Sequence, residues 1–409
     1  MKRKTVINMP RTRIVISLVM ATFVVSGCSW FGDENEPVEI KPNPLPRIKP
    51  EVSFSTVWSK KIGQGAKEKA LRIEPTIQGK RVISASPDGK VKSHFADSGK
   101  EIWTVDIKDI FEEQNSSYEL LGNLDILTGG VEANSEHVFV CSASGHLLAL
   151  NQIDGSFAWK ASISSESLSP PKVDNDLVVV QTIDGKVAGY DASDGSRRWE
   201  YAAKIPPLTL RGTSTPEVYD DIVIAGFSNG RTVFITRDDG LAAYEQIVGV
   251  PQGVSDLEKL VDLDGEIAIE NNVLYISGYQ GRLVAIDLRA GKILWEQEAS
   301  SLVGVSFGFG NVYLISADGK VIAYNSSNGR EVWRVEALLN RRLNAPLVVG
   351  SFLAFTDFEG YLHLLAQSDG RFVARKKLDS RGVGARLVQQ EGRIYALGNS
   401  GTLSVLEIR

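Results

Sequence analysis

Short segments rich in β-branched and aromatic residues recur along the chain, and turn dipeptides separate them every 8–12 residues. Examples are residues 138–142, 177–181, 273–277 and 320–325. Side chains of a strand point to opposite faces in turn, so this pattern favours short β-strands. We find no segment with a sustained helical period. From Ser53 onward, the sequence predicts an all-β protein.

These segments belong to a repeat, which is most complete at residues 317–333. There, two Gly turns flank one strand, and a second strand ends in Trp. The first-turn glycines of the seven copies are Gly89, Gly145, Gly185, Gly230, Gly281, Gly319 and Gly360. The residues 14 positions later are Trp103, Trp159, Trp199, Tyr244, Trp295, Trp333 and Ala374. Successive copies start 38 to 56 residues apart, and a constant core with variable connectors indicates a repeat architecture.

An eighth copy starts at Gly401, but the chain ends before its Trp position. An unassigned Trp58 lies at the other end of the repeat region. The N-terminal strand therefore supplies the missing outer strand of the last repeat, which leaves the ring without a free edge. We predict an eight-bladed β-propeller of four-stranded antiparallel blades over residues 53–409. The repeat Trp side chains are expected to pack between blades.

The N-terminal residues have the pattern of a targeting segment. A basic start precedes the apolar run 14–25, which is too short to span a bilayer as a helix. Residues 25–28, Val-Ser-Gly-Cys, resemble the bacterial lipobox, and this resemblance implies a signal peptide over residues 1–27 with lipid on Cys28. Ser29 resembles the sorting pattern of outer-membrane lipoproteins. The alternative is an ordinary secretory peptide with an incidental Cys.

Residues 28–52 are predicted to form a Pro-rich tether behind the lipidated Cys. Five prolines and five acidic residues lie between positions 29 and 52, with no apolar period. Such a composition favours an extended, semi-stiff chain. The predicted location is the periplasmic face of the outer membrane, with the propeller held off the lipid surface.

Charge and residue inventory exclude several classes of function. The net charge is −5 although residues 1–27 carry five basic and no acidic side chains, which argues against nucleic-acid binding. The four His show no metal-ligand spacing, and neither a P-loop nor a nucleophile elbow is present. Cys141 is read as a small buried hydrophobe. We therefore predict no cofactor, no metal and no small-molecule substrate.

The repeat phrase, as in residues 185–190 and 281–286, resembles the PQQ-type repeat of quinoprotein dehydrogenases. That resemblance implies the propeller fold but not the activity. Those enzymes stack their cofactor on adjacent cysteines, and some carry a haem-attachment motif; this sequence contains neither. A PQQ-dependent dehydrogenase and a cell-wall-binding propeller with exposed aromatics stay open as alternatives.

Lipobox, acidic tether and eight such blades together resemble the propeller lipoproteins of the outer-membrane β-barrel assembly machinery. The resemblance implies a non-enzymatic scaffold that aids folding and insertion of outer-membrane proteins. It also implies docking on the periplasmic POTRA domains of the central barrel subunit, BamA. The positions that match the docking patch of that family are Leu208, Leu210, Arg211, Asp262 and Asp264.

The expected geometry agrees with this assignment. Residues 200–215 join blades three and four, and residues 245–266 join blades four and five, so both connectors lie on one face. The alternative is that both Leu side chains tuck under the loop and that the Asp residues cap turns. Residues 106–130, read as a polar loop, and 334–345 could extend the surface. Unfolded outer-membrane strands could also pair with free blade edges.

Overall fold

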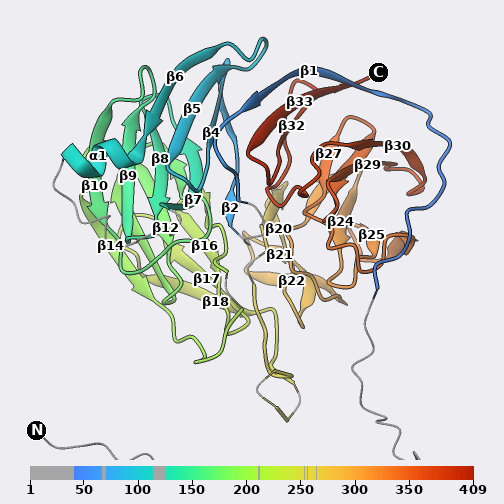
Figure 1. Cartoon of the computed structure of the whole chain (residues 1–409). Coiled ribbons are helices and arrows are strands. Elements are labelled where there is room, and N and C mark those ends of the chain that lie inside the picture. Colours follow the sequence, from blue (N-terminus) through green and yellow to red (C-terminus); the bar gives the residue numbers. More distant parts are fainter. Residues whose placement is uncertain are drawn as a thin grey trace, which may run out of the picture. The chain divides into compact units, whose positions relative to one another are not determined.

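The computed structural model describes residues 41–66, 71–113, 126–210, 212–252, 254–255, 257–263 and 265–409. The predicted signal peptide and Cys28 lie outside these ranges. The described residues form eight sheets, one per blade, and they confirm the predicted eight-bladed propeller (Figure 1). Each blade has four antiparallel strands, and β2 (Arg72–Ile73) adds a fifth strand that runs parallel to the first strand of blade two.

Blades one to four follow the chain in order. Blade one is β3 (Thr76–Gln78), β4 (Arg81–Ala85), β5 (Lys90–Phe95) and β6 (Glu101–Asp106). Blade two is β7 (Leu127–Ala133), β8 (His137–Ser142), β9 (His146–Asn151) and β10 (Phe157–Ser162). Blade three is β11 (Lys172–Asp174), β12 (Leu177–Gln181), β13 (Lys186–Asp191) and β14 (Arg197–Ala202). Blade four is β15 (Glu217–Tyr219), β16 (Ile222–Gly226), β17 (Arg231–Thr236) and β18 (Ala242–Ile247).

Blades five to eight continue this order. Blade five is β19 (Ala268–Glu270), β20 (Val273–Ile276), β21 (Arg282–Asp287) and β22 (Lys292–Glu298). Blade six is β23 (Ser306–Gly308), β24 (Asn311–Ile315), β25 (Val321–Asn325) and β26 (Glu331–Val335). Blade seven is β27 (Leu347–Val349), β28 (Phe352–Thr356), β29 (Tyr361–Ala366) and β30 (Phe372–Lys377). Blade eight is β31 (Val388–Gln390), β32 (Arg393–Leu397), β33 (Thr402–Ile408) and β1 (Phe54–Lys61).

The two ends of the propeller close the ring as predicted. Strand β1 pairs antiparallel with β33 from Phe54 opposite Ile408 to Lys61 opposite Thr402. Ser53 and Arg409 exchange two backbone hydrogen bonds of 2.8 and 2.9 Å. Blade eight is therefore built from both termini.

The repeat Trp side chains join neighbouring blades. Six indole N–H groups each donate to a backbone carbonyl in the next blade, over 2.7–3.1 Å. The same rings cover the second-turn glycine of that blade; a Cβ at Gly195, for example, would lie 2.4 Å from Trp159. Each Trp thus fills a seam and satisfies a carbonyl. Cys141 is fully buried in β8, as expected.

A short helix corrects the expectation of a chain without helices. Helix α1 (Ile107–Glu113) lies in the connector predicted as a polar loop. Its buried side chains, Ile107, Ile110 and Phe111, recur at the three- and four-residue spacing of one helix face and join the hydrophobic core. A seven-residue helix is too short for its apolar pattern to be distinguished from that of a strand by sequence alone. No helix among the described residues has the length and apolar character needed to cross a membrane.

A second correction concerns the tether. Residues 41–52, which we call the N-terminal strap, contact the propeller instead of extending freely from it. The carbonyls of Asn43 and Pro46 accept hydrogen bonds from Arg341 (3.0 Å) and Arg375 (3.1 Å). Leu45 packs against the hydrophobic cluster of blades six and seven. The compact unit therefore begins at Lys41, not at Ser53.

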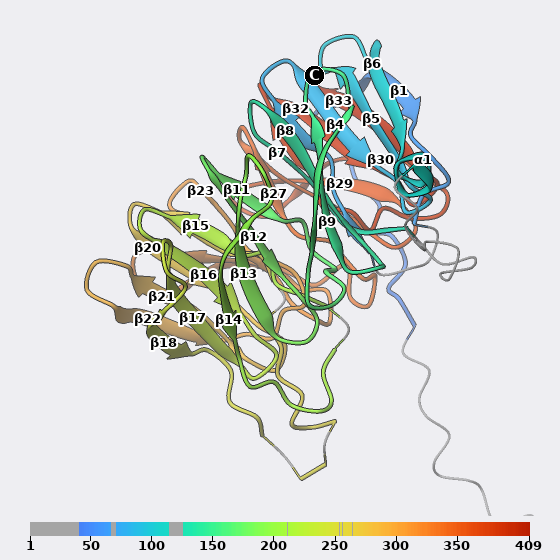
Figure 2. The same cartoon turned by 90° about the vertical axis from the view of Figure 1, so that its left-hand side faces the viewer.

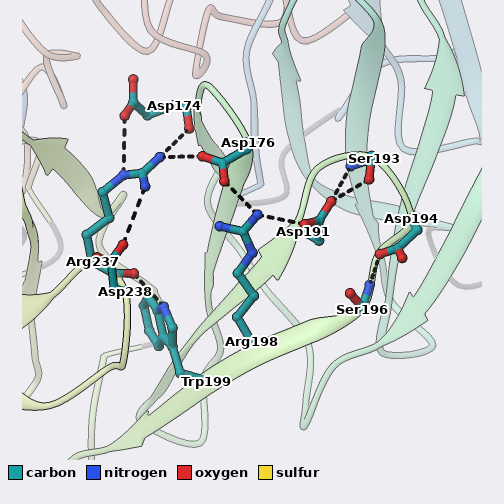
Figure 3. A network of polar contacts seen from close by, with 10 residues as sticks. All are labelled: Asp174, Asp176, Asp191, Ser193, Asp194, Ser196, Arg198, Trp199, Arg237 and Asp238. Atoms are coloured by element: carbon teal, nitrogen blue, oxygen red, sulfur yellow. Dashed lines mark hydrogen bonds and ion pairs between the residues drawn. The ribbon is translucent and has the colours of Figure 1, made fainter.

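Blades three and four are also joined by a network of ion pairs (Figure 3). Arg237 of blade four donates to Asp176 over 2.7 Å, in the turn between β11 and β12. Arg198 of β14 links Asp176 to Asp191, with both distances 2.6 Å. Hydrogen bonds from Arg237 and Arg198 lower the pKa of Asp176 to about 2. The network and the Trp199 indole, which donates to the Arg237 carbonyl, hold the same seam.

This network predicts an acid-sensitive contribution to stability. Because the pKa of Asp176 is lowered from 3.8, the stabilisation is complete above about pH 4 and is lost as the pH falls towards about 2. Arg237→Gln should lower the free energy of unfolding by about 1 kcal/mol at pH 6, since the partners are solvent-exposed. The difference from wild type should shrink in urea titrations repeated down to pH 2. A constant difference across this range would contradict the assignment.

Candidate docking surface

The two connectors singled out from the sequence lie at the same end of the propeller. In each blade the turn between the second and third strands, and the connector after the fourth, must emerge at one end because the strands are antiparallel. The connector 203–216 follows β14, and the connector 248–267 follows β18. Both project to the lower edge in Figures 1 and 2, beside one another. The Asn229 side chain, between β16 and β17, donates to the Lys204 carbonyl at 2.9 Å.

The two Leu side chains have different environments. Leu208 is 45% exposed. Leu210 is half-buried and lines a cavity of about 170 Å³ between blades three and four, together with Ile183, Ile205 and Phe227. The alternative that both Leu side chains tuck under the loop therefore applies only to Leu210. Arg211 lies outside the described residues.

Asp262 is placed in the interior and not on the surface. It is 2% exposed, and its backbone exchanges hydrogen bonds with Tyr279. Val261 and Leu263 on either side are buried, and Leu263 packs against the backbone of Gly226 and Gly278. Asp262 thus fixes the end of the connector within the seam between blades four and five. Asp264 lies outside the described residues.

The same connector presents apolar residues that the sequence analysis missed. Val254 is 90% exposed and Leu257 is 69% exposed. A reciprocal cap shapes this turn: the N–H groups of Val254 and Ser255 donate to the Glu258 carboxylate, and the Glu258 N–H donates to the Ser255 hydroxyl. These bonds lower the pKa of Glu258. In the sequence, the three-residue spacing between Ser255 and Glu258 indicates this reciprocal cap.

We define the docking surface by Leu208, Leu210, Val254 and Leu257. Leu208, Val254 and Leu257 are exposed apolar side chains on two connectors at one end of the propeller, and exposed apolar surface is typical of protein-binding sites. Of the other two long connectors, the one after β6 lies outside the described residues over positions 114–125. In the connector 336–346, Leu338 and Arg341 are buried, and Arg341 pairs with Asp357.

The centre of the propeller holds a cavity of about 430 Å³. Its lining includes four carboxylates and two cationic side chains: Glu74, Glu132, Glu217, Glu266, Lys172 and Arg386. Burial and the neighbouring Glu266 raise the pKa of Glu74 to about 7. Arg386, before β31, pairs with Glu266, before β19. This lining is unsuited to an anionic quinone cofactor, which the dehydrogenase alternative requires.

The repeat Trp side chains do not support the alternative of a cell-wall-binding propeller. Within the described ranges, no three His, Cys, Asp or Glu side chains are grouped to hold a metal ion. All six repeat Trp side chains are at most 9% exposed, so none offers a stacking surface for cell-wall sugars.

Comparisons with known proteins assign the family. The family described as "Outer membrane protein assembly factor BamB" matches residues 87–335 and 317–409. A relative of that name from Pseudomonas aeruginosa is 37% identical over 393 residues, which cover 96% of this chain and 98% of the relative. One from Yersinia pestis is 33% identical over the same shares. The chain belongs to the BamB family.

Solved structures agree with BamB membership. The crystal structure of BamB from Moraxella catarrhalis matches with a TM-score of 0.77 at 26% identity, covering 87% of this chain and 100% of that one. A quinohemoprotein alcohol dehydrogenase from Comamonas testosteroni matches with a TM-score of 0.66, covering 86% of this chain and 76% of its own. Its identity of 14% supports a common fold alone.

Proposed function

We propose that this protein is a non-enzymatic scaffold of the outer-membrane β-barrel assembly complex. The observation that carries the proposal is the docking surface, where two neighbouring connectors present exposed Leu and Val side chains at one end of a rigid propeller. Rigid aliphatic groups beside polar residues are suited to the centre of a protein interface. BamB relatives are named assembly factors, which supports the same role.

The proposed partner is the periplasmic POTRA region of the barrel subunit, BamA. Leu208 and Leu210 would supply apolar contacts, and Arg211 would supply charge. The positions of Asp262 and Asp264 match the family patch, but the burial of Asp262 indicates that it positions its connector and makes no direct contact. The scaffold would hold the barrel subunit and its substrates close together during folding and insertion.

A pull-down from detergent-solubilised envelopes tests this function directly. The tagged full-length protein should retain the barrel subunit in approximately stoichiometric amounts, identified by mass spectrometry. Recovery of cell-wall fragments or of a respiratory enzyme without the barrel subunit would overturn the proposal. Adding PQQ with Ca²⁺ to the purified protein should give neither bound absorbance nor dye-linked oxidation of alcohols.

We further propose that lipid on Cys28 anchors the protein to the inner leaflet of the outer membrane. Each buried acyl CH₂ contributes about 0.8 kcal/mol, and the lipobox pattern implies several chains. Cys28→Ala should therefore move the protein from the membrane to the soluble envelope fraction, as measured by immunoblotting of fractions. Membrane association that survives a high-salt wash in this variant would count against the anchor.

A further inference from the structure

Two of the eight seams between blades lack the Trp that joins the other six. Tyr244 takes its position at the seam between blades four and five, and Ala374 takes it between blades seven and eight. We call these the 4/5 seam and the 7/8 seam. Their different contents show what each seam requires.

The chain itself fills the 7/8 seam. The Glu51 N–H donates to the Val373 carbonyl of β30 over 2.8 Å, and Val52 and Phe54 pack against the cluster that contains Ala374. An extended segment thus covers the outer strand of blade seven and places apolar side chains where the Trp is missing. This arrangement is an internal example of how such a seam is completed.

The 4/5 seam has no such cover among the described residues. Gly291 is the second-turn glycine of blade five, and no atom lies within 4 Å of the position where its Cβ would be. At the six equivalent glycines beneath Trp rings, a Cβ would lie 2.4–2.9 Å from the nearest ring atom. Tyr244 is 39% exposed, and its hydroxyl donates to Gln246 of its own strand over 2.5 Å. No indole N–H therefore reaches the Leu288 carbonyl, the acceptor equivalent to those used by the six Trp.

Apolar side chains face the open 4/5 seam from both blades. Tyr244 lies opposite Phe234 on β17, and Ile293 lies opposite Ile286 on β21. Directly opposed residues share a face of the sheet. Phe234 and Ile286 belong to the core cluster between blades four and five, so Tyr244 and Ile293 project into the outer part of that seam.

The outer edge of β18 is also competent for strand pairing. Strand β18 is the edge strand of its sheet, and five of its six side chains are exposed. Its sequence, Ala-Ala-Tyr-Glu-Gln-Ile, has one charge, whereas the outer strands β14 and β22 each carry at least three. Charges on edge strands discourage pairing with other chains. Among the described residues, blade four combines a weakly charged edge strand with an open seam.

We propose that the 4/5 seam binds an extended, amphipathic β-strand of an unfolded outer-membrane protein. Its backbone would pair with the edge of β18, and a large apolar or aromatic side chain would enter the space over Gly291. Transmembrane strands alternate apolar and polar residues and carry aromatic residues near both membrane interfaces, which suits this site. The choice of this partner rests on the proposed function in barrel assembly.

The test uses fluorescence anisotropy with a labelled peptide of about ten residues, the length of a transmembrane strand. The peptide alternates Thr and Val around one central Trp, and a second peptide has the same composition in an order without alternation. Wild-type protein should bind the alternating peptide saturably and the other peptide at least about tenfold more weakly. Absence of saturable binding, or equal binding of both peptides, would overturn the proposal.

Two variants localise the site. Tyr244→Trp should close the seam, raise the thermal unfolding midpoint and weaken peptide binding at least about tenfold, because its indole would occupy the space over Gly291. Ile293→Glu should weaken binding similarly. The control is Val332→Glu, an exposed apolar position on the outer strand of blade six, which should bind as wild type. Unchanged binding by Tyr244→Trp would overturn the assignment.

The same variants separate this inference from the proposed function. Gly291 lies at the opposite end of the blades from the docking surface, so Tyr244→Trp should still retain the barrel subunit in pull-downs. Loss of the barrel subunit in this variant would assign the seam to that partner and overturn the strand proposal. If wild type binds the peptide but fails to retain the barrel subunit, the proposed function fails while the strand site stands.

Discussion

Leu208→Glu should abolish co-purification with the barrel subunit while leaving the propeller folded. Leu208 is 45% exposed, so the introduced carboxylate stays hydrated in the free protein and costs little stability. In a complex, the same carboxylate would be buried without a partner. Truncation at the centre of an interface commonly costs at least 2 kcal/mol, and a buried unpaired charge costs more. An affinity loss exceeding about 30-fold should remove the partner during washing.

The matched control is Ile153→Glu. Ile153 is 72% exposed in the turn between β9 and β10, at the opposite end of the propeller from the docking surface. The substitution therefore also replaces an exposed aliphatic side chain by a carboxylate, but away from that surface. This variant should retain the barrel subunit at wild-type levels. Leu210→Glu and Arg211→Glu should also lose the partner, although Leu210→Glu places its charge in a cavity wall and should lower the thermal midpoint. Retention of the barrel subunit by Leu208→Glu would refute the docking assignment.

The fold was predictable because one local pattern encodes both the turns and the seams. Positive φ at Gly89 and Gly319, 97° and 92°, is what tight turns require, so glycine is needed there and its spacing is visible in the sequence. The Trp positions follow because each ring covers a glycine of the next blade. The orphan Trp58 indicated ring closure for the same reason. Constraints that repeat in every blade leave a periodic signal.

The docking surface was only partly predictable, because burial depends on partners far away in sequence. Asp262 looks like an accessible carboxylate in Val261-Asp-Leu-Asp264, but Val261 and Leu263 pack into a seam and carry it inward. The N-terminal strap is another case: its Pro-rich composition predicts an extended chain, and it is extended. The composition does not indicate that Arg341 and Arg375, about 300 residues later, donate hydrogen bonds to the strap's backbone carbonyls. Missing pattern elements proved as informative as present ones, since Tyr244 and Ala374 identify the two seams without a Trp, and residues 51–54 of the same chain cover the one at Ala374.

The strap rests on a buried polar network in blade seven. Asp357, fully buried, accepts hydrogen bonds from Arg341 at 2.9 Å and lies 3.0 Å from the His363 ring nitrogen. Burial alone would raise the pKa of Asp357, but bonds from His363, the Tyr361 N–H and Arg341 together lower it. Burial lowers the pKa of His363. A neutral His363 can donate to Asp357 through one ring nitrogen and accept from Arg375 through the other, at 3.3 Å.

Arg341→Ala should be among the most destabilising single substitutions in this chain. The side chain is 4% exposed, and its removal leaves the Asp357 carboxylate buried without its cation. Breaking a buried ion pair in this way typically costs about 3–5 kcal/mol. Urea unfolding should show this loss, whereas Arg334→Ala, which breaks exposed pairs on β26, should change the free energy of unfolding by about 0.5 kcal/mol or less.

A second measurement separates release of the strap from general destabilisation. Without Arg341 the Asn43 carbonyl loses its donor, so the peptide bond after Arg47, an exposed residue of the strap, should become accessible to trypsin under native conditions. Arg341→Ala should be cut there much faster than wild type while the propeller core stays intact. Cleavage at the wild-type rate, together with unchanged unfolding, would show that the network does not hold the strap. Because the strap lies between Cys28 and the blades, its release would lengthen the link to the proposed lipid anchor by up to about 3.3 Å for each freed residue.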